Sequence, residues 1–254
     1  MGTKGYPLGI DIGGSGIKGA PVDLDQGELV TKRKRILTPQ PATPDAVADV
    51  VDQIVDHFAD QTLSSAIGVT VPGVVVRGTV LSAANIDPSW IGIDAAALIE
   101  EHTGRSVTVL NDADAAGVAE LHYGAAKGVM GLVIVTTLGT GIGSALINDG
   151  VLVPNSELGH LEMDGQPAEK IAAASIKEIE GLSYEEYIPR LQRYYSMLER
   201  LFTPDLIIVG GGISKESELF LPHLRLRAPI VPAKLRNQAG IIGAARIAAD
   251  RAGT

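Results

Sequence analysis

Apolar and polar positions at the start of the chain follow a pattern that is typical of antiparallel strands. Three strand-like segments, at 8–12, 16–22 and 28–36, are separated by short turns, which predicts a β-meander. The glycine-rich turn after the first stretch leads into Gly19 and Pro21, which disfavour a helix. Because a dinucleotide-binding fold needs a helix directly after its glycine loop, this pattern excludes that fold.

The remaining pattern alternates between amphipathic helices and short apolar strands. The clearest helix is predicted at 43–58, where Thr43 is a suitable N-cap, Pro44 fits the first turn and the apolar positions have helical spacing. Further helices are expected at 94–102, 113–123, 171–179, 184–202 and 237–251, and strands at 66–71, 106–110, 131–137, 143–147 and 205–209.

Both halves of the chain open with a β-hairpin, which suggests a duplicated architecture of two lobes with a cleft between them. We expect residues 1–110 together with 237–254 to form the smaller lobe, and residues 111–236 to form the larger one. The fold class is therefore α/β.

The composition limits the possible functions. The chain has 254 residues, of which 45% are hydrophobic and 4% aromatic, as in an ordinary globular protein with a sizeable core. It has no cysteine, which excludes disulfides, cysteine-ligated zinc and cysteine nucleophiles. The net charge of −9 disfavours nucleic-acid binding. Since the sequence shows no signal peptide and no apolar run of ~18 residues, we expect a cytoplasmic protein without a membrane partner.

Two glycine-rich turns are the strongest functional signal. The first lies within 9–18 and contains Asp11, and the second spans 137–143. Each could present several backbone N–H groups to an anion. A carboxylate beside a phosphate is repulsive unless a cation separates them, so Asp11 indicates Mg²⁺ beside a phosphate chain, although an aspartate can also close its own turn. Ser15 would add a hydroxyl and an N–H group, and Lys18 is either a further positive charge or a solvated lysine.

Asn111 and Asp112 lie where a predicted strand gives way to a predicted helix. Side chains at this position commonly face a ligand, and Asp112 could be the general base that accepts the proton of a hydroxyl attacking phosphorus. Helix capping is the structural alternative, but it requires only one of the two residues.

Three other segments carry candidate chemistry. Glu157 and His160 are three positions apart and would share one face of a helical turn; a neutral polyol suits them better than zinc, which usually has more His or Cys ligands, and a structural role is the alternative for His160. Gly211 and Gly212 follow a predicted strand and permit close approach to a ligand, or form a plain strand-to-helix turn. The basic run 32–35 is either a solvated strand edge or a contact for a long polyanion.

Taken together, these motifs resemble the ROK family of sugar kinases. The resemblance rests on segments 11–15, 111–112, 137–143 and 157–160, and segments 37–44, 83–92 and 110–117 are similar to the polyphosphate glucokinases of this family. It implies the actin-like ATPase (ribonuclease H-like) fold, with two lobes and a central cleft. It also implies a homodimer that phosphorylates the 6-hydroxyl of glucose with polyphosphate or ATP as donor and Mg²⁺ as cofactor.

The resemblance further assigns roles to individual residues. Asp112 would be the general base, and Asp11 would organise Mg²⁺ mostly through water and phosphate. The glucose hydroxyls would be held by Asn85, Asn111, Asp112, Glu157, His160 and Glu169. The donor would be held by Asp11, Gly13, Gly14, Ser15, Gly16, Lys18, Thr137, Gly139, Thr140, Gly141 and Gly143, with Gly211 and Gly212 near the adenosine of ATP.

Two departures from the wider family qualify this hypothesis. Many ROK kinases have a cysteine-rich zinc site after the Glu-x-Gly-His motif; polyphosphate glucokinases resemble this chain in lacking it, so no zinc is expected. Segment 176–188 lacks the tryptophans expected of polyphosphate-using relatives, which leaves the preferred donor open. The alternatives are an ATP-dependent glucokinase, a polyphosphate/ATP glucomannokinase or, in another class, a sugar-sensing ROK regulator. Such regulators carry a DNA-binding extension, whereas about seven residues precede Leu8.

Overall fold

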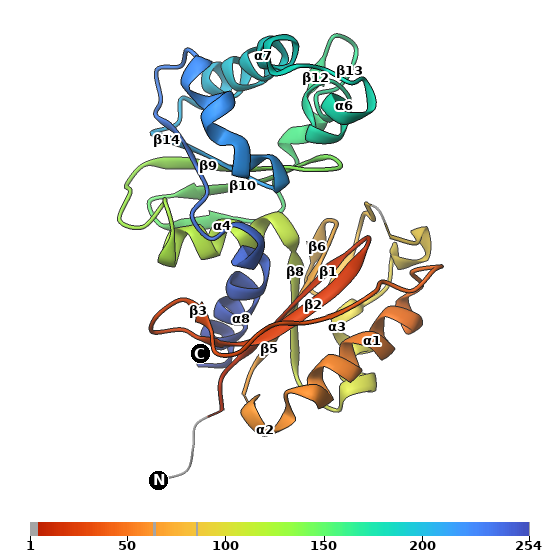
Figure 1. Ribbon diagram of the computed structural model, residues 1–254. Coiled ribbons are helices and arrows are strands. Elements are labelled where there is room, and N and C mark those ends of the chain that lie inside the picture. Colours follow the sequence, from red (N-terminus) through yellow and green to blue (C-terminus); the bar gives the residue numbers. More distant parts are fainter. Residues whose placement is uncertain (1–4, 63–64, 85, 254) are drawn as a thin grey trace. The chain divides into compact units, whose positions relative to one another are not determined.

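A computed structural model describes residues 5–62, 65–84 and 86–253 of the chain. The chain divides into two compact units (Figure 1), one formed by Met1–Ala119 with Gln238–Thr254 and the other by Glu120–Asn237. The boundary between the units falls inside helix α4 (Asp112–Tyr123). Each unit is built around a mixed β-sheet with helices packed on it.

The first unit begins with an antiparallel hairpin whose strands continue into a parallel sheet. The sheet order is β3-β2-β1-β5-β8, with β4 also paired to β2. Strands β1 and β2 are antiparallel, whereas β1, β5 and β8 are mutually parallel neighbours. The strands are β1 (Leu8–Gly13), β2 (Gly16–Asp23), β3 (Glu28–Leu29), β4 (Lys34–Ile36), β5 (Ile67–Val71) and β8 (Val107–Asn111).

The β-meander predicted from the sequence is confirmed for its first two strands. The prediction of a single third strand at 28–36 was wrong. Residues 28–36 form two short strands, β3 and β4, separated by residues 30–33. This interruption includes Lys32 and Arg33. Because charged side chains are stabilised by solvent rather than by burial, this part of the segment has no apolar face to hold it on the sheet.

Helices cover both faces of the first sheet. Figure 1 shows α8 (Ala239–Ala252) on one face and α1 (Pro44–His57) with α3 (Ala95–Thr103) on the other. Helix α8 approaches the sheet so closely that a Cβ on Gly9 would lie 1.9 Å from the Ile241 carbonyl oxygen, and one on Gly68 would lie 2.0 Å from that of Ala244. Only glycine at these two strand positions allows the helix to pack at this distance.

Helix α1 agrees with its sequence prediction. Thr43 is the N-cap residue and Pro44 starts the helix, although the Thr43 side chain makes no capping hydrogen bond. The apolar face is buried. The remaining small elements of this unit are α2 (Ala59–Thr62), the hairpin of β6 (Val75–Val76) and β7 (Thr79–Val80), and the 3₁₀ turn η1 (Pro88–Trp90).

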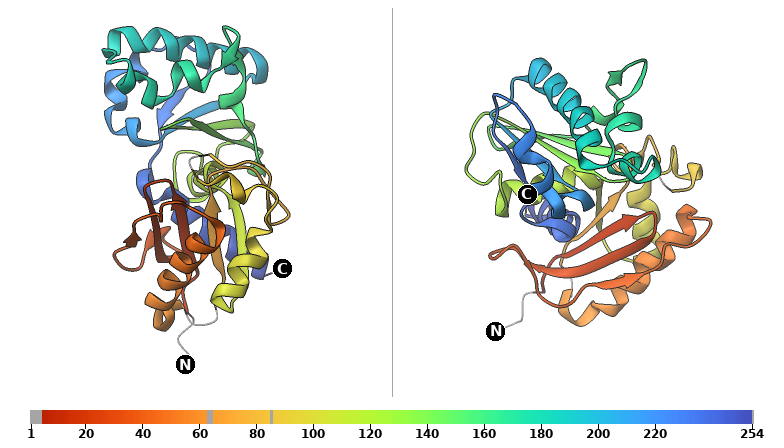
Figure 2. Two further views of the ribbon diagram at one scale, coloured as in Figure 1. Left: turned by 90° about the vertical axis from the view of Figure 1, so that its right-hand side faces the viewer. Right: turned by 45° about the horizontal axis from the view of Figure 1, so that its top comes forward.

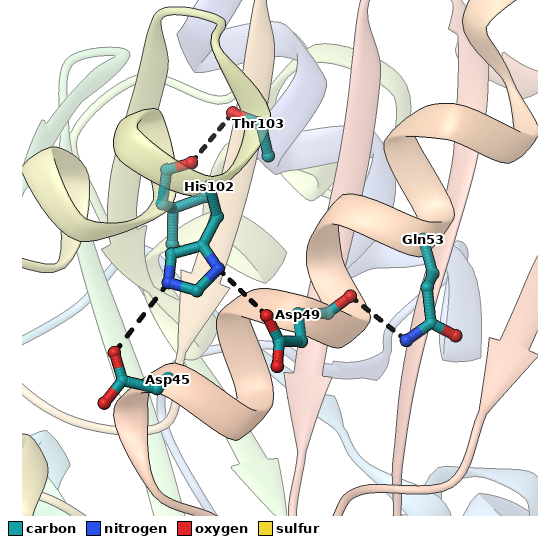
Figure 3. A network of polar contacts seen from close by, with 6 residues as sticks. Asp45, Asp49, Gln53, His102 and Thr103 are labelled. Carbon is teal, nitrogen blue, oxygen red and sulfur yellow. Dashed lines mark hydrogen bonds and ion pairs between the residues drawn. The ribbon is translucent and has the colours of Figure 1, made fainter.

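His102 links α3 to α1, which pack against each other (Figure 2). Its Nδ1 atom lies 3.0 Å from Asp49 Oδ1 and its Nε2 atom lies 3.8 Å from Asp45 Oδ1 (Figure 3). Both aspartates belong to α1 and are largely exposed. Since exposed ion pairs contribute little to stability, the packing of α1 on α3 does not depend mainly on this bridge.

The sheet of the second unit repeats the arrangement of the first. Its order is β11-β10-β9-β14-β15, in which β9 and β10 form an antiparallel hairpin and β9, β14 and β15 are parallel neighbours. The series β10-β9-β14-β15 therefore matches β2-β1-β5-β8 in order and direction, which confirms the expected duplication. The strands are β9 (Leu132–Leu138), β10 (Ile142–Asn148), β11 (Val151–Val153), β14 (Leu206–Gly210) and β15 (Ile230–Pro232).

Helix α7 (Tyr184–Phe202) supports one face of this second sheet. It begins with a capping box between Ser183 and Glu186 and buries three tyrosines and two leucines, which join a core that includes Ile134 and Ile207 of the sheet. The alternate strand residues, among them Val133 and Ile208, belong to a separate core. The sheet is therefore buried on both faces.

The smaller elements of the second unit surround the sheet. The helix expected at 171–179 is divided at Ala173, which has an extended conformation; the prediction of one continuous helix was wrong. The elements are η2 (Leu158–His160), β12 (Glu162–Met163), β13 (Gln166–Pro167), α5 (Glu169–Ala172), α6 (Ala174–Ile179), η3 (Gly212–Leu219) and η4 (Leu221–His223), and η5 (Arg236–Gln238) leads into α8. Within the part of the chain that the structure describes, no helix has both the length and the apolar character needed to cross a bilayer.

Candidate active site

The first glycine loop is the turn Gly14-Ser15 between β1 and β2, with Gly13 paired to Gly16 at its base. Asp11 lies within β1 rather than in the turn itself. Its Oδ1 atom accepts a hydrogen bond of 3.0 Å from Thr70 Oγ1, and its Oδ2 atom lies 3.6 Å from Lys18 Nζ. The neighbouring strands thus fix the carboxylate from both sides, and Lys18 is more than a solvated lysine.

Asp11 also lies beside the start of helix α8. A Cβ on Gly240, in the first turn of this helix, would be 3.2 Å from Asp11 Oδ1. The Asp11 carboxylate therefore lies at the N-terminal end of α8, where an anion interacts favourably with the helix dipole. These contacts are unlike those of an aspartate that closes its own turn, which was the structural alternative.

The environment of Asp11 fits a magnesium ligand. Mg²⁺ is usually held by one or two carboxylates together with phosphate oxygens and water, and the Asp11 side chain is 22% exposed. Among the described residues, no group of three or more His, Asp or Glu side chains is arranged to hold a metal ion.

Asn111 and Asp112 form the junction between β8 and α4. Asn111 is buried, and its Oδ1 atom accepts hydrogen bonds from the backbone N–H groups of Ala113 (2.8 Å) and Asp114 (3.0 Å), while its Nδ2 atom donates to the Gly73 carbonyl (2.9 Å). Asn111 therefore caps α4. Helix capping was the structural alternative for Asn111 and Asp112, and Asn111 takes this role. Asp112 is partly exposed, and its Oδ1 atom accepts from the Ala113 N–H at 2.8 Å.

The second glycine loop connects β9 to β10. Thr137 pairs with Gly143 across this hairpin, and at the tip the Gly139 N–H group donates to the Gly141 carbonyl at 3.0 Å. Thr140 is exposed at the tip. The loop is therefore a tight turn between two strands, like the first.

Glu169 joins this loop to the predicted sugar-binding residues. It is the first residue of α5, and its Oε2 atom accepts a hydrogen bond of 3.3 Å from the Ile142 N–H. A Cβ on Gly141 would lie 2.4 Å from the same oxygen, so a larger residue there would displace the Glu169 carboxylate. The Oε1 atom lies 3.9 Å from His160 Nε2. The structure thus brings Glu169, His160 and the second glycine loop together.

Glu157 has the most perturbed environment in this cluster. Burial raises its pKa, and the negative charge of Glu169 raises it further, while His160 acts in the opposite direction. It immediately precedes the 3₁₀ turn η2, which carries His160. Shifted carboxyl pKa values are common at functional sites because such sites combine burial with like charges.

A cavity of about 310 Å³ opens beside the second glycine loop. Its lining comes from the end of β9 and the loop after it, from α6, from the start of α7 and from η3: Leu138, Gly139, Thr140, Ala174, Ser175, Lys177, Glu178, Tyr184, Gly212, Ile213 and Glu216. Gly211 has a φ of +82°, and a Cβ there would lie 2.1 Å from the Leu138 carbonyl oxygen. The Gly211 backbone packs directly on the end of β9, and the next residue, Gly212, lines the cavity. A Cβ added to Gly212 would have no atom within 4 Å.

One wall of this cavity is polar. Tyr184 donates a 2.6 Å hydrogen bond to Glu216 Oε2, and Lys177 Nζ lies 4.4 Å from the centre of the Tyr184 ring. Burial and the adjacent Glu216 raise the pKa of Tyr184, so its hydroxyl remains a donor. Neither Tyr184 nor Glu216 could be identified from sequence motifs, because neither belongs to a glycine motif. Asn85, which was expected to bind sugar, lies outside the described residues.

A model of the ROK family matches residues 7–175 of the chain. The chain belongs to the ROK family. It is 51% identical over 244 residues to a polyphosphate glucokinase of Mycobacterium tuberculosis, an alignment that covers 96% of this chain and 91% of that protein. The predicted resemblance is therefore confirmed.

Two solved structures extend the comparison to the fold of this ROK protein. The inorganic polyphosphate/ATP-glucomannokinase of Arthrobacter sp. strain KM is 56% identical, with a TM-score of 0.94 over 98% of this chain and 100% of that one. A ROK family glucokinase from Streptomyces griseus, in complex with glucose and AMPPNP, is 26% identical, with a TM-score of 0.83 over 97% and 100% of the two chains. These matches confirm the actin-like ATPase fold.

Proposed function

We propose that this ROK protein transfers the terminal phosphoryl group of polyphosphate, or of ATP, to the 6-hydroxyl of glucose. The observation that carries the proposal is the connection through Glu169, which contacts both the second glycine loop and His160. Glu169 thereby holds a candidate phosphate-binding loop next to a cluster of side chains suited to binding hydroxyl groups. The similarity to a polyphosphate glucokinase and to a polyphosphate/ATP-glucomannokinase supports both donors.

The acceptor sugar would be bound by acids and amides. Ionised Glu157 and Glu169 accept hydrogen bonds from sugar hydroxyls, and His160 can donate or accept one. Asn111 offers the second hydrogen of its Nδ2 group, and Asn85 would complete the set. These groups suit a neutral polyol, because its hydroxyls can act as donors to the acids and as acceptors from the amides.

Asp112 would act as the general base. Its carboxylate would accept the proton of the glucose 6-hydroxyl while the oxygen attacks the terminal phosphorus. The new bond joins this oxygen to phosphorus, and the bond to the bridging oxygen of the donor breaks. The leaving group is a polyphosphate shorter by one phosphate, or ADP. Proton transfer by a positioned carboxylate and alignment of the reacting atoms both accelerate such a step.

The donor phosphates would be held by the two glycine loops. Backbone N–H groups of Gly13, Gly14, Ser15 and Gly16 would contact phosphate oxygens. In the second loop those of Thr140 and Gly141 would do so, since the Gly139 and Ile142 N–H groups are already bound within the protein. Lys18 would neutralise part of the phosphate charge. Mg²⁺ bound at Asp11 would neutralise charge that develops on the phosphate oxygens.

When ATP is the donor, its nucleoside would occupy the cavity beside Gly211 and Gly212. The volume of about 310 Å³ is at the lower end of the range for small-molecule pockets. The carboxylates of Glu178 and Glu216 line this cavity. They suit the hydroxyls of an uncharged ribose and repel additional phosphates, so a polyphosphate chain would not extend into it.

The deciding experiment compares initial rates of glucose 6-phosphate formation with long-chain polyphosphate and with ATP, in the presence of Mg²⁺ and after addition of EDTA. We expect activity with both donors and its loss with EDTA. Failure of both donors to yield glucose 6-phosphate in the presence of Mg²⁺ would refute the proposed reaction.

We also infer a homodimer that works in the cytoplasm. The proposed substrate ATP and the product glucose 6-phosphate are intracellular metabolites, which supports this location. The dimer is implied by the resemblance to the family. Light scattering coupled to size-exclusion chromatography would test it against the monomer mass of 26.5 kDa.

A further inference from the structure

Two backbone carbonyls of the first glycine loop are held by side chains from a more distant segment. The Thr38 hydroxyl donates to the Gly13 carbonyl at 2.5 Å, and Arg35 Nη2 donates to the Ser15 carbonyl at 3.0 Å. Thr38 is buried, and Arg35 belongs to β4, which pairs with β2. The stretch from Arg35 to Thr38 therefore fastens both sides of the turn Gly14-Ser15.

The second glycine loop has an equivalent set of bonds. The backbone N–H of Ser175 donates to the Gly139 carbonyl at 3.0 Å, and the Ser175 hydroxyl donates to the Thr140 carbonyl at 2.7 Å. The next carbonyl, that of Gly141, accepts from the Gly139 N–H. Three consecutive carbonyls at the tip of this loop are thus bound within the protein, two of them by Ser175.

These bonds have the same electrostatic consequence in both loops. A carbonyl oxygen carries partial negative charge and repels phosphate oxygens, whereas an N–H group attracts them. Glycine-rich turns can rotate their peptide groups easily, which would replace an N–H group by a carbonyl at the anion. A hydrogen bond to the carbonyl opposes that rotation, so it keeps the turn prepared for an anion before the donor arrives.

We propose that Thr38, Arg35 and Ser175 are positioning residues for the phosphoryl donor, which hold the two glycine loops in their anion-accepting conformation by binding the loop carbonyls. This proposal rests on the proposed function of those loops as donor-phosphate sites. Thr38 lies in segment 37–44 and Arg35 in the basic run 32–35, but the sequence assigned neither of them, nor Ser175, a role in holding the glycine loops. They act on the donor through the loop backbone.

Arg35 has a second structural connection to the loop. A Cβ on Gly16 would lie 2.7 Å from Arg35 Nε, so the guanidinium group lies directly on this glycine. Arg35 is also the strand partner of Lys18. The planar guanidinium can rest on the peptide and donate to Ser15 at the same time, which the single ammonium group of a lysine does not reproduce.

The test uses variants that remove one carbonyl contact and leave the loops unchanged. Thr38→Val removes the hydroxyl and keeps the side-chain shape, Thr38→Ser keeps the hydroxyl, and Ser175→Ala removes one of the two Ser175 bonds. We expect Thr38→Val and Ser175→Ala to raise the KM for both polyphosphate and ATP by about three- to tenfold, the effect of one net hydrogen bond. The KM for glucose should stay unchanged, and Thr38→Ser should behave like the unaltered protein.

Matched controls separate loop positioning from general effects. Thr103→Val and Ser196→Ala remove hydroxyls that make contacts inside α3 and α7, so they should leave every KM unchanged. For Arg35, Arg35→Lys keeps the charge but loses the contact, and Lys34→Gln loses one charge from the same strand. The proposal expects a higher donor KM for Arg35→Lys than for Lys34→Gln at high salt, where simple charge attraction is screened.

Binding of tripolyphosphate, measured by calorimetry without glucose, distinguishes this proposal from the proposed reaction. We expect the unaltered protein to bind tripolyphosphate and Thr38→Val to weaken this binding by about three- to tenfold, the effect of one net hydrogen bond. The positioning role then stands even if no phosphoryl transfer is found. The positioning role fails if folded Thr38→Val and Ser175→Ala bind tripolyphosphate as tightly as the unaltered protein. It also fails if these variants raise the glucose and donor KM values equally.

Discussion

Asp112 and Glu157 are both acids of the candidate active site, but their surroundings give them different tasks. Asp112 is the first residue of α4, where the positive end of the helix stabilises a carboxylate. Glu157 lies in a more buried position close to Glu169, and both factors raise its pKa. Asp112 is partly exposed at the junction of β8 and α4, where it could accept a proton from a substrate hydroxyl, whereas the raised pKa of Glu157 makes sugar binding sensitive to pH.

Asp112→Asn should abolish the proposed reaction without unfolding the protein. Asparagine keeps an oxygen that can accept from the Ala113 N–H but cannot accept a proton from the sugar. We expect kcat to fall by roughly 10²–10⁴-fold, the usual contribution of a general base, while glucose still binds in calorimetry. Substantial activity in this variant would remove Asp112 from its proposed role.

Glu157 should make both stability and glucose binding depend on pH. Since its pKa is raised in the folded protein, its ionisation costs more in the folded than in the unfolded chain. Its contribution to stability therefore decreases as pH rises from the ordinary glutamate range through the raised pKa. We expect Glu157→Gln to unfold at a higher temperature than the unaltered protein at neutral pH, with the difference vanishing in acid.

The raised pKa of Glu157 also predicts how glucose binding depends on pH. The KM for glucose should rise as pH falls through the raised pKa of Glu157, because the protonated acid is a poorer acceptor. Glu157→Gln should show a high KM at every pH. A KM that changes with pH equally in both proteins would assign the transition to a different group.

At the scale of elements, the distance between α8 and the first sheet positions Asp11. The helix lies close to β1 and β5 because Gly9 and Gly68 have no side chains, and its first turn then comes to lie beside the Asp11 carboxylate. In the second unit, Gly141 similarly lets the Glu169 carboxylate reach the loop backbone. Packing between elements therefore sets the geometry of both halves of the candidate site.

Gly68→Ala should separate α8 from the sheet. A methyl group would lie 2.0 Å from the Ala244 carbonyl oxygen, so the helix has to move. We expect a loss of about 1–3 kcal/mol in the free energy of unfolding, as for other overpacked sites, measured by urea denaturation. Gly253→Ala is the matched control, since its Cβ would make only ordinary contacts at 3.5 Å or more; an equal loss in both variants would contradict the close-packing explanation.

At the scale of the whole molecule, one topology has been used twice. Each unit presents a glycine turn at the end of a hairpin whose first strand continues into a parallel sheet. The units differ in what surrounds this turn. The first unit has the basic segment 32–35, of which Lys34 and Arg35 pair with β2, and the second has the cavity beside Gly212. This difference predicts separate determinants for the two donors.

Gly212→Val should discriminate against ATP. The added side chain meets no atom within 4 Å at its Cβ and extends into the cavity, so it should exclude a nucleoside without disturbing the fold. We expect the KM for ATP to rise at least about tenfold, equivalent to ~1.4 kcal/mol of lost binding, and the KM for polyphosphate to stay the same. Gly212→Ala, with its smaller side chain, should be intermediate. An equal rise for both donors would show that the cavity is not specific to the nucleotide.

Neutralising the basic segment should have the opposite selectivity. We expect the combined substitutions Lys32→Gln, Arg33→Gln and Lys34→Gln to raise the KM for long-chain polyphosphate more than that for ATP or glucose. The difference should shrink as salt is added, because the attraction is electrostatic. Arg35 is left intact, since it also contacts the first loop. Unchanged KM values would identify the segment as an ordinary solvated strand edge.

The sequence predicted the local structure correctly wherever neighbouring residues decide it. Both glycine hairpins, helix α1 and the strand-to-helix junction at Asn111-Asp112 were predicted from local patterns and are present. The sequence did not predict the structure of short segments whose conformation depends on residues far away in the chain. The edge strands β11 and β15 were missed, and the helix at 171–179 is divided at Ala173.

The sequence by itself determined the fold class, the two glycine turns and the acid at the start of α4, because turn chemistry, capping and periodicity depend on adjacent residues. Only the tertiary structure decided how these parts are held. Thr70 contacts Asp11 from 59 positions away, Glu169 contacts Ile142 from 27, and Ser175 contacts Thr140 from 35. Such contacts follow from strand register and packing, which no local pattern specifies.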